Sequence, residues 1–319
     1  MKNRSAGLSI QMPTTVLESP KQTVYQLLQS SSCEPWFLRL LQACPEIVAK
    51  LNDPSVSCTV WFPKYIPSDL ADADPETTSA WIRRHITPFA VSSSVLYTMP
   101  NVPTLAGDTG LQGSQLLRAR PEYLSSIGPT FSVNFDCHVV QKDRSATNGL
   151  IHVIDQPLPE YRCLDAVLAG LPTAQFSFLL AAMEYFQISL SPHRGGTFFA
   201  PTNDAFAGHG LTTKATVLPR ILAAHFCPHQ TLYSNMLRGG ENATKPPPLW
   251  QPLPREGQVL EGTRKFKLNS SLQGQIVEVA VYRRGGLIEM KTDSGATVIS
   301  SDHLASDGVL HVVDKLVFS

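Results

Sequence analysis

The chain has 319 residues, which at about 100 to 200 residues per domain predicts two domains, each large enough to bury its own core. Lys and Arg number 26 and Asp and Glu also number 26, so the formal net charge is zero, which excludes the basic balance of a nucleic-acid-binding protein. Charged residues make up only 16% of the chain, against roughly 25% in an average globular protein, and no apolar run of about 18 residues is present that would span a membrane.

The spacing of apolar residues predicts the elements of each half. In the first half these are, in chain order, helices over 23–29 and 37–51, a strand over 59–63, a short helix ending at His85, and a closing hairpin of strands over 131–141 and 150–155. In the second half they are helices over 164–171 and 176–186, a strand over 197–201, a short helix ending at His225, and strands over 295–304 and 309–314. Helices that precede a hairpin-rich region are typical of the α+β class rather than of alternating β/α folds.

The two halves repeat one another. NGLIHVID at 148–155 matches DGVLHVVD at 307–314, TVWFP at 59–63 matches TFFAP at 197–201, and WIRRH at 81–85 matches ILAAH at 221–225, in the same order. The Asn-Gly and Asp-Gly pairs that open the octapeptides predict type I′ hairpin turns. The extra length of the second half falls after His225, where a run of three prolines predicts an insertion or extended loop near 240–255.

FFAPTNDAF at 198–206 and GVLHVVDKLVF at 308–318 resemble the two signature segments of the fasciclin (FAS1) family, and the segment around His225 resembles the family's central motif. In the first half NGLIHVIDQPL at 148–158 matches equally well, whereas TVWFPKYIPSD at 59–69 lacks the Asn-Asp pair. The resemblance covers 20–159 as a first domain with a divergent motif and 160–319 as a second domain with typical motifs. It implies two tandem FAS1 domains, each a wedge-like β-sandwich flanked by helices.

Duplication also sorts the histidines. His152 and His311 occupy equivalent positions in the two repeats, as do His85 and His225, and a residue duplicated in this way is more often structural than catalytic. A specialised site is therefore expected where the repeats differ.

The residues present only in the first half supply such a candidate. Aromatic and Met side chains with a few cations describe a small-molecule pocket. We predict that the wall of this pocket is formed by Trp61, Tyr65, Trp81, Tyr97 and Met99. Arg83, Arg84 and His85 are the predicted catalytic donors. The plainer alternative, in which the tryptophans belong to the core and the arginines to the surface, is the commoner arrangement.

Cofactor and metal signatures do not point to conventional chemistry. The sequence lacks a GxSxG elbow, an HExxH motif, a P-loop and a GxGxxG segment, so no cofactor is expected. His225, Cys227 and His229 lie close together, but a proline interrupts them and no carboxylate accompanies them, so no metal is expected there.

Two functions remain open. The chain is similar, in its tandem layout and lack of cofactor motifs, to fungal FAS1-like pathway enzymes that join a quinone methide to a terpene by hetero-Diels–Alder addition. This similarity implies a cofactor-independent pericyclase of fungal secondary metabolism with a small apolar or aromatic ligand. The alternative implied by the family is an extracellular adhesion or cell-wall protein.

Localisation is left open by the sequence. The first twenty residues show no apolar run of signal-peptide length, which predicts a cytoplasmic protein if the chain is complete and a secreted one if it has been trimmed. Asn3, Asn242 and Asn269 begin N-x-S/T triplets, which would matter in a secreted protein. A homo-oligomer is compatible with the sequence.

Overall fold

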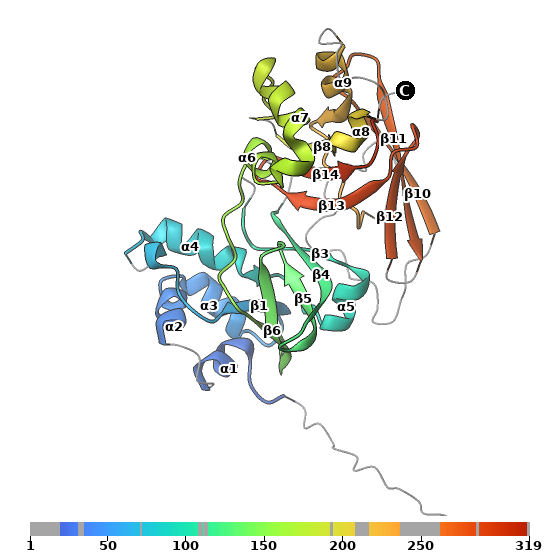
Figure 1. The fold of residues 1–319 in the computed structure, drawn as a ribbon. Helices are drawn as coiled ribbons and strands as arrows, with labels where there is room; N and C mark the ends of the chain where they lie inside the picture. The colour runs from blue at the N-terminus through green and yellow to red at the C-terminus, as the bar shows by residue number, and fades with distance from the viewer. Residues whose placement is uncertain are drawn as a thin grey trace, which may run out of the picture.

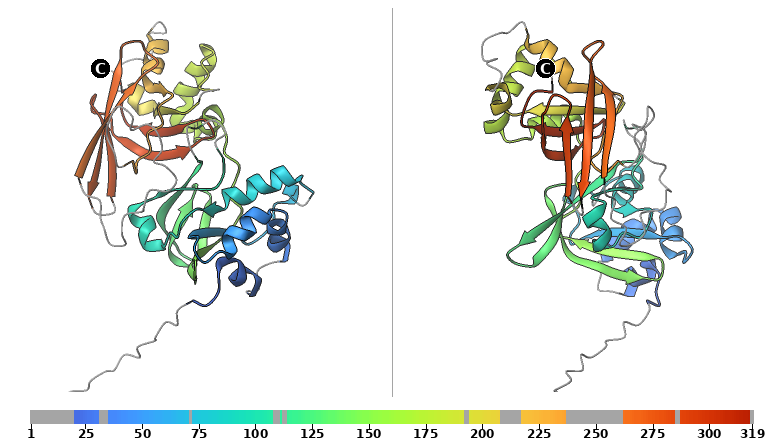
Figure 2. Two further views of the ribbon diagram at one scale, coloured as in Figure 1. Left: turned by 180° about the vertical axis from the view of Figure 1, so that it is seen from behind. Right: turned by 90° about the vertical axis from the view of Figure 1, so that its right-hand side faces the viewer.

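A computed structural model shows a chain folded into two lobes, one above the other in Figure 1. The lower lobe contains the N-terminal half and the upper lobe the C-terminal half, and both turned views in Figure 2 show the same division. The residues that the structure describes are 20–30, 35–70, 72–107, 111, 114–191, 194–207, 217–236, 262–284 and 287–317.

The first lobe begins with helices. These are α1 (Val24–Ser30), α2 (Pro35–Gln42) and α3 (Pro45–Asn52), followed after one strand by the 3-10 turn η1 (Ser68–Leu70) and α4 (Pro75–Arg84), and after a second, short strand by α5 (Ser93–Thr98). The single helix predicted over 37–51 is two helices, because Pro45 lacks the N–H needed inside a helix and starts a new one instead. At the start of α4 the Asp74 side chain accepts hydrogen bonds from the next turn, which fixes where that helix begins.

A seven-stranded sheet completes this lobe. Its strands, in spatial order, are β2 (Ile86–Thr87), β1 (Cys58–Pro63), β7 (Gly149–Ile154), β6 (Cys137–Ala146), β5 (Gly128–Val133), β4 (Leu116–Leu124) and β3 (Asn101–Pro103). The neighbours β1 and β7 are parallel, and the remaining pairs are antiparallel. Side chains alternate across a strand, so Val60 and Phe62 face a core shared with α1 to α4, while Trp61 faces a second core beside α5.

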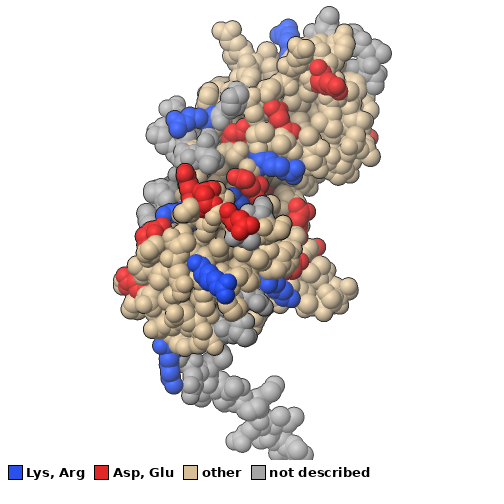
Figure 3. Space-filling model, turned by 90° about the vertical axis from the view of Figure 1, so that its left-hand side faces the viewer, with Lys and Arg blue, Asp and Glu red and all other residues tan. Residues whose placement is uncertain are grey.

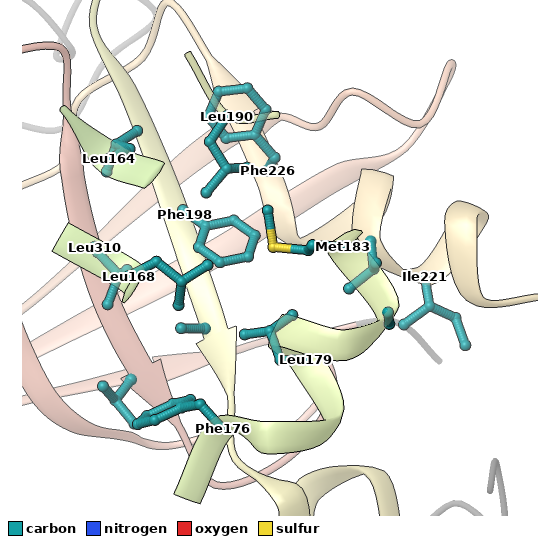
Figure 4. Close-up of a cluster of buried hydrophobic side chains, with 14 of the residues drawn as sticks. Leu164, Leu168, Phe176, Leu179, Met183, Leu190, Phe198, Ile221, Phe226 and Leu310 are labelled. Carbon is teal, nitrogen blue, oxygen red and sulfur yellow. The ribbon is translucent and has the colours of Figure 1, made fainter. Parts of the chain in front are cut away.

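The second lobe repeats this arrangement with its sheet in two pieces. Its helices are α6 (Leu164–Ala169), α7 (Thr173–Tyr185), α8 (Asn203–Ala207) and α9 (Leu218–His225). A four-stranded sheet has the order β13 (Val298–Leu304), β14 (Val309–Val313), β8 (Gly196–Pro201) and β9 (Phe226–Pro228), and a three-stranded sheet has the order β10 (Gly262–Asn269), β11 (Ile276–Arg284) and β12 (Leu287–Thr292). Phe198 points into the helical core drawn in Figure 4, whereas Phe199 belongs to the core on the other side of the sheet.

The repeat seen in the sequence is confirmed as a repeat in space. The octapeptides become β7 and β14, and TVWFP and TFFAP become β1 and β8, so that β1 runs parallel to β7 as β8 runs parallel to β14. The histidines that end the short helices also occupy equivalent places, because α4 stops just before His85 and α9 stops at His225. The predicted α+β class of two domains holds for both lobes.

The predicted type I′ turns are wrong, although the hairpins that they join are present. A type I′ turn needs positive φ at both central residues, but of the pair Asn148 and Gly149 only the glycine has it, at +153°. Asn148 is instead buried, and its side-chain oxygen accepts the backbone N–H of Val24 at 2.7 Å. The glycine is needed for close approach, because a Cβ at this position would stand 1.8 Å from the carbonyl oxygen of Cys58.

Two further expectations need correction or lie outside the described residues. The single strand predicted over 131–141 is β5 and β6 joined by a turn at 134–136, and β4, which precedes them, was not predicted at all. The proline-rich stretch near 240–255 and the triplets at Asn3 and Asn242 fall outside the described residues, so the structure does not test them.

Candidate functional site

A Ser-Asp-His unit with a buried histidine lies in the first domain at the start of α5. The backbone N–H and hydroxyl of Ser93 both donate to the carboxylate of Asp143, and the backbone N–H of Asp143 donates to Nδ1 of His152 at 3.2 Å. Nε2 of His152 then donates to the carbonyl oxygen of Val91 at 2.8 Å, which identifies a neutral ring with its proton on Nε2. Asp143 has a positive φ of 58°, so the strand bulges at this residue to aim the carboxylate at Ser93.

The same unit recurs in the second domain. Ser234 donates through its backbone N–H and its hydroxyl to Asp302, whose own N–H donates to Nδ1 of His311 at 3.1 Å. Nε2 of His311 donates to the carbonyl oxygen of Leu232 at 2.8 Å, and Asp302 has a positive φ of 61°. The unit therefore belongs to the scaffold of both domains, in agreement with the structural role expected for the duplicated histidines.

His85 and His225 form a second duplicated unit. Nε2 of His85 accepts the backbone N–H of Leu158 at 2.9 Å, so its proton sits on Nδ1 and is donated to the carbonyl oxygen of Trp81 at 2.8 Å. His225 makes the equivalent contacts with Ile221 and Val317. Burial lowers the pKa of His85 to about 3, which keeps the ring neutral at physiological pH. Each ring ties the end of its domain to a helix, and this accounts for its duplication.

The two predicted catalytic arginines lie near His85 in sequence but face different partners. The Arg83 guanidinium donates to Glu46 at 2.9 Å on the surface. Arg84 is more buried and lies 6.0 Å from the ring centroid of Tyr161 and 3.9 Å from the carboxylate of Glu160. Burial lowers the pKa of Arg84, but it remains a cation. Neither arginine points toward a shared centre with the other.

The five predicted wall residues are also dispersed. Trp61 is fully buried, and its indole N–H donates to Thr87, while Trp81 packs on the opposite side of the sheet against His85 with ring centroids 3.9 Å apart. Tyr65 and Tyr97 are exposed, and Met99 follows the last residue of α5. The tryptophans are therefore core residues, and the structure does not bring the five side chains to one place. Their role in binding stays a prediction.

Residues that the sequence did not single out meet where the two lobes touch. Strand β4 of the first domain lies against β13 of the second domain, directly below it in Figure 1. From β4, the Arg120 guanidinium forms an ion pair with Asp302 at 2.5 Å and donates to the hydroxyls of Ser234 and Ser301. Arg118, two residues earlier, donates through Nε to the carbonyl oxygen of Ser301 at 3.0 Å. Asp302 is fully buried, so this contact joins the scaffold unit of one domain to a strand of the other.

An aromatic stack lies beside the ion pair. The Arg118 guanidinium sits 3.8 Å from the ring centroid of Phe135, and the other partner of that ring is the His303 imidazole, stacked at 4.4 Å with planes 21° apart. Phe135 lies in the turn between β5 and β6, where it and Asn134 have positive φ values of 75° and 50°. The turn is fixed to β4, because Asn134 and Arg118 exchange hydrogen bonds of 2.9 and 2.8 Å. The backbone thus presents Phe135 in a conformation that bulky residues seldom adopt.

The charges of this junction strongly perturb its titratable groups. Burial would raise the pKa of Asp302, but the Arg120 guanidinium and the hydrogen bonds from Ser234 outweigh it and lower the pKa to about 2. Burial, together with the positive charge of Arg118, lowers the pKa of His303 to about 3. The site therefore combines an ionised carboxylate, several guanidinium cations and a neutral imidazole. On the face drawn in Figure 3, acidic and basic side chains gather around the waist between the lobes.

The first domain has the same aspartate but not the same surroundings. Asp143 is flanked on its strand by Lys142 and Arg144, whereas the second aspartate is flanked by Ser301 and His303. The basic neighbours in the first domain would repel an incoming arginine. The two repeats therefore differ in the residues that flank this aspartate. The sequence signal for it is an aspartate nine residues before the motif histidine in both halves.

Comparison with known proteins defines the class of this scaffold. A family model for the fasciclin domain matches residues 37–160 and again residues 173–318. These matches cover most of the chain, which therefore belongs to the fasciclin family and contains two domains of that type. Among solved structures, the chain is similar to a FAS1 domain pair from the insect cell adhesion molecule fasciclin I, with 15% sequence identity, coverage of 89% of this chain and 97% of that chain, and a TM-score of 0.40.

Within the described ranges, no group of three or more His, Cys, Asp or Glu side chains is arranged to hold a metal ion. None of the helices in the described part of the chain is both long and apolar enough to cross a bilayer.

Proposed function

We propose that this fasciclin-domain pair binds a small organic molecule at the junction of its two domains and acts on it without a cofactor. The observation that carries the proposal is the stack of Arg118, Phe135 and His303 beside the ion pair of Arg120 with Asp302. Flat aromatic surfaces next to a few fixed polar groups are typical of small-molecule sites, and such sites occur preferentially between domains. Phe135 is 38% exposed, so its ring is reachable from solvent.

The finer form of this proposal is a hetero-Diels–Alderase of fungal secondary metabolism that joins a quinone methide to a terpene. A guanidinium N–H beside a planar ring is suited to donate to the carbonyl oxygen of a quinone methide, which makes that diene more electrophilic. The exposed part of the Phe135 side chain would hold the flat partner against the terpene, and such placement alone contributes several kcal/mol to a two-substrate reaction. Arg118 and Arg120 are the donors of this proposal, and the first-domain set around Arg84 and Trp81 is the competing location.

The test is an incubation of the purified protein with a quinone methide precursor and a terpene, followed by chiral chromatography of the adduct. We expect one stereoisomer in excess, with its rate of formation lowered at least tenfold in Arg118→Gln and Phe135→Ala. Arg144→Gln, which changes a half-buried arginine of β6 in the first domain, is the matched control, and Arg84→Gln tests the competing location. Racemic product at the background rate would overturn the enzyme proposal, and a loss confined to Arg84→Gln would move the site to the first domain.

An adhesive or cell-wall function is a second candidate, favoured by one observation. Asn269, the first residue of an N-x-S triplet, lies exposed at the end of β10, where a glycan would meet solvent. Expression through a secretory pathway with peptide mapping tests whether Asn269 is glycosylated, and a cell-binding assay on the secreted protein tests adhesion. A glycan together with saturable cell binding would support this function, and a secreted protein that lacks both would remove it.

A further inference from the structure

The domain junction contains more positive than negative charge. Besides Arg118 and Arg120, Arg283 from β11 reaches it and donates to the carbonyl oxygen of Ser234 at 3.1 Å. In the described part of the chain, the carboxylate that acts electrostatically on all three guanidinium groups is that of Asp302. Three arginines around one carboxylate leave two positive charges without a matching anion in this set.

Burial makes this imbalance costly. Arg118 is only 9% exposed, and burial together with the charge of Arg120 lowers its pKa to about 10. Burial also lowers the pKa of Arg283, and the charge of Arg120 adds to the effect. Arg118 and Arg283 have both lost hydration without forming a full ion pair. A bound anion would therefore be stabilised electrostatically by these guanidinium groups. The neutral His303 ring adds no charge of its own.

The shape of the surroundings narrows the class of anion. Phe135 packs against both the Arg118 guanidinium and the His303 ring and is still 38% exposed, so an aromatic ring entering the junction would meet aromatic surface directly beside the cation. Inorganic anions would use the cations but not the rings, and neutral aromatics would use the rings but not the cations. We propose that the junction recognises a planar aromatic oxyanion, a carboxylate or a phenolate attached directly to the ring. This proposal rests on the proposed function in that it places the ligand at the same junction.

Calorimetric titration of the full chain with benzoate, benzamide and acetate tests the inference. Benzoate has both features, benzamide lacks the charge and acetate lacks the ring. We expect benzoate to bind at least tenfold more tightly than either of the others, and more weakly as salt is raised. Arg118→Gln and the less buried Arg283→Gln should each weaken benzoate binding at least tenfold, while Arg144→Gln leaves it unchanged. Thermal melting of each variant verifies that it is folded, so that Arg283→Gln decides the question if Arg118→Gln does not fold.

The outcomes separate this inference from the proposed function. Equal binding of benzoate and benzamide, or benzoate binding that survives both arginine changes, would overturn the oxyanion inference, even if stereoselective adduct formation is observed. Conversely, selective benzoate binding that depends on Arg118 and Arg283 would support the inference even if no adduct forms. Absence of benzoate binding at millimolar concentration would also overturn it.

Discussion

The contribution of the ion pair between the domains to the free energy of unfolding can be measured by substituting each of the two equivalent aspartates, Asp302 and Asp143, in turn. Asp302→Asn removes the carboxylate that accepts from Arg120 and Ser234 in a fully buried position and leaves the guanidinium without its partner. Removing one member of a buried ion pair costs about 3–5 kcal/mol. Asp143→Asn removes a carboxylate that accepts the same two hydrogen bonds from Ser93, with no arginine in contact among the described residues. Hydrogen bonds to a charged group contribute about 1.5–3 kcal/mol, so this change should cost less.

We therefore expect Asp302→Asn to lower the free energy of unfolding by about 2 kcal/mol more than Asp143→Asn does. The scaffold contribution is common to both aspartates, so the difference reports the contact with Arg120. Urea denaturation followed by far-ultraviolet circular dichroism measures both variants, and a cycle that adds Arg120→Gln measures the coupling directly. Equal losses for the two aspartates, or a coupling energy below about 0.5 kcal/mol, would refute the reasoning.

Three further predictions follow from buried groups. Burial lowers the pKa of His85 and His303 from 6.5 to about 3, so below pH 6.5 the unfolded chain takes up protons that the folded chain does not. The free energy of unfolding should therefore be about 2 kcal/mol lower at pH 5 than at neutral pH for each of these histidines. A His303→Gln variant should lose less stability on acidification. Gly149→Ala would place a Cβ against a backbone carbonyl at a φ of +153°, and we expect a loss of at least about 3 kcal/mol, read from the melting temperature; an unchanged melt would contradict this. Burial raises the pKa of the Cys58 and Cys227 thiols to about 12, so mass spectrometry should find them unmodified by a thiol reagent at pH 8 until the protein is unfolded; rapid modification of the native protein would contradict their burial.

Local patterns in the sequence were a good guide to the scaffold. The matched octapeptides predicted the strands that become β7 and β14, and apolar spacing predicted helices that the structure contains. The same patterns misjudged Asn148, because an Asn-Gly pair reads as a turn whether its side chain faces solvent or, as here, accepts a hydrogen bond from Val24 far away in the sequence. They also missed β4, whose arginines and proline interrupt the alternation that marks a strand.

The candidate site was much less accessible from the sequence. The predicted site residues all lie in the first half, because they have no counterpart in the second half. Trp61 and Trp81, however, are core residues on opposite sides of one sheet and form no common site. Repeat asymmetry was a sound criterion, but it had to be applied to the neighbours of Asp143 and Asp302, which lie outside the signature motifs.

By itself the sequence determined the duplication, the α+β class and the structural role of the paired histidines, because all of these depend on short-range patterns that each repeat states twice. Only the tertiary structure decided which of two equivalent aspartates receives a cation. Arg120 and Asp302 are separated by 182 positions along the chain, and no local pattern encodes their meeting. It depends on how one folded domain packs against the other, and this contact brings three arginines and two stacked rings to the junction where we place the function.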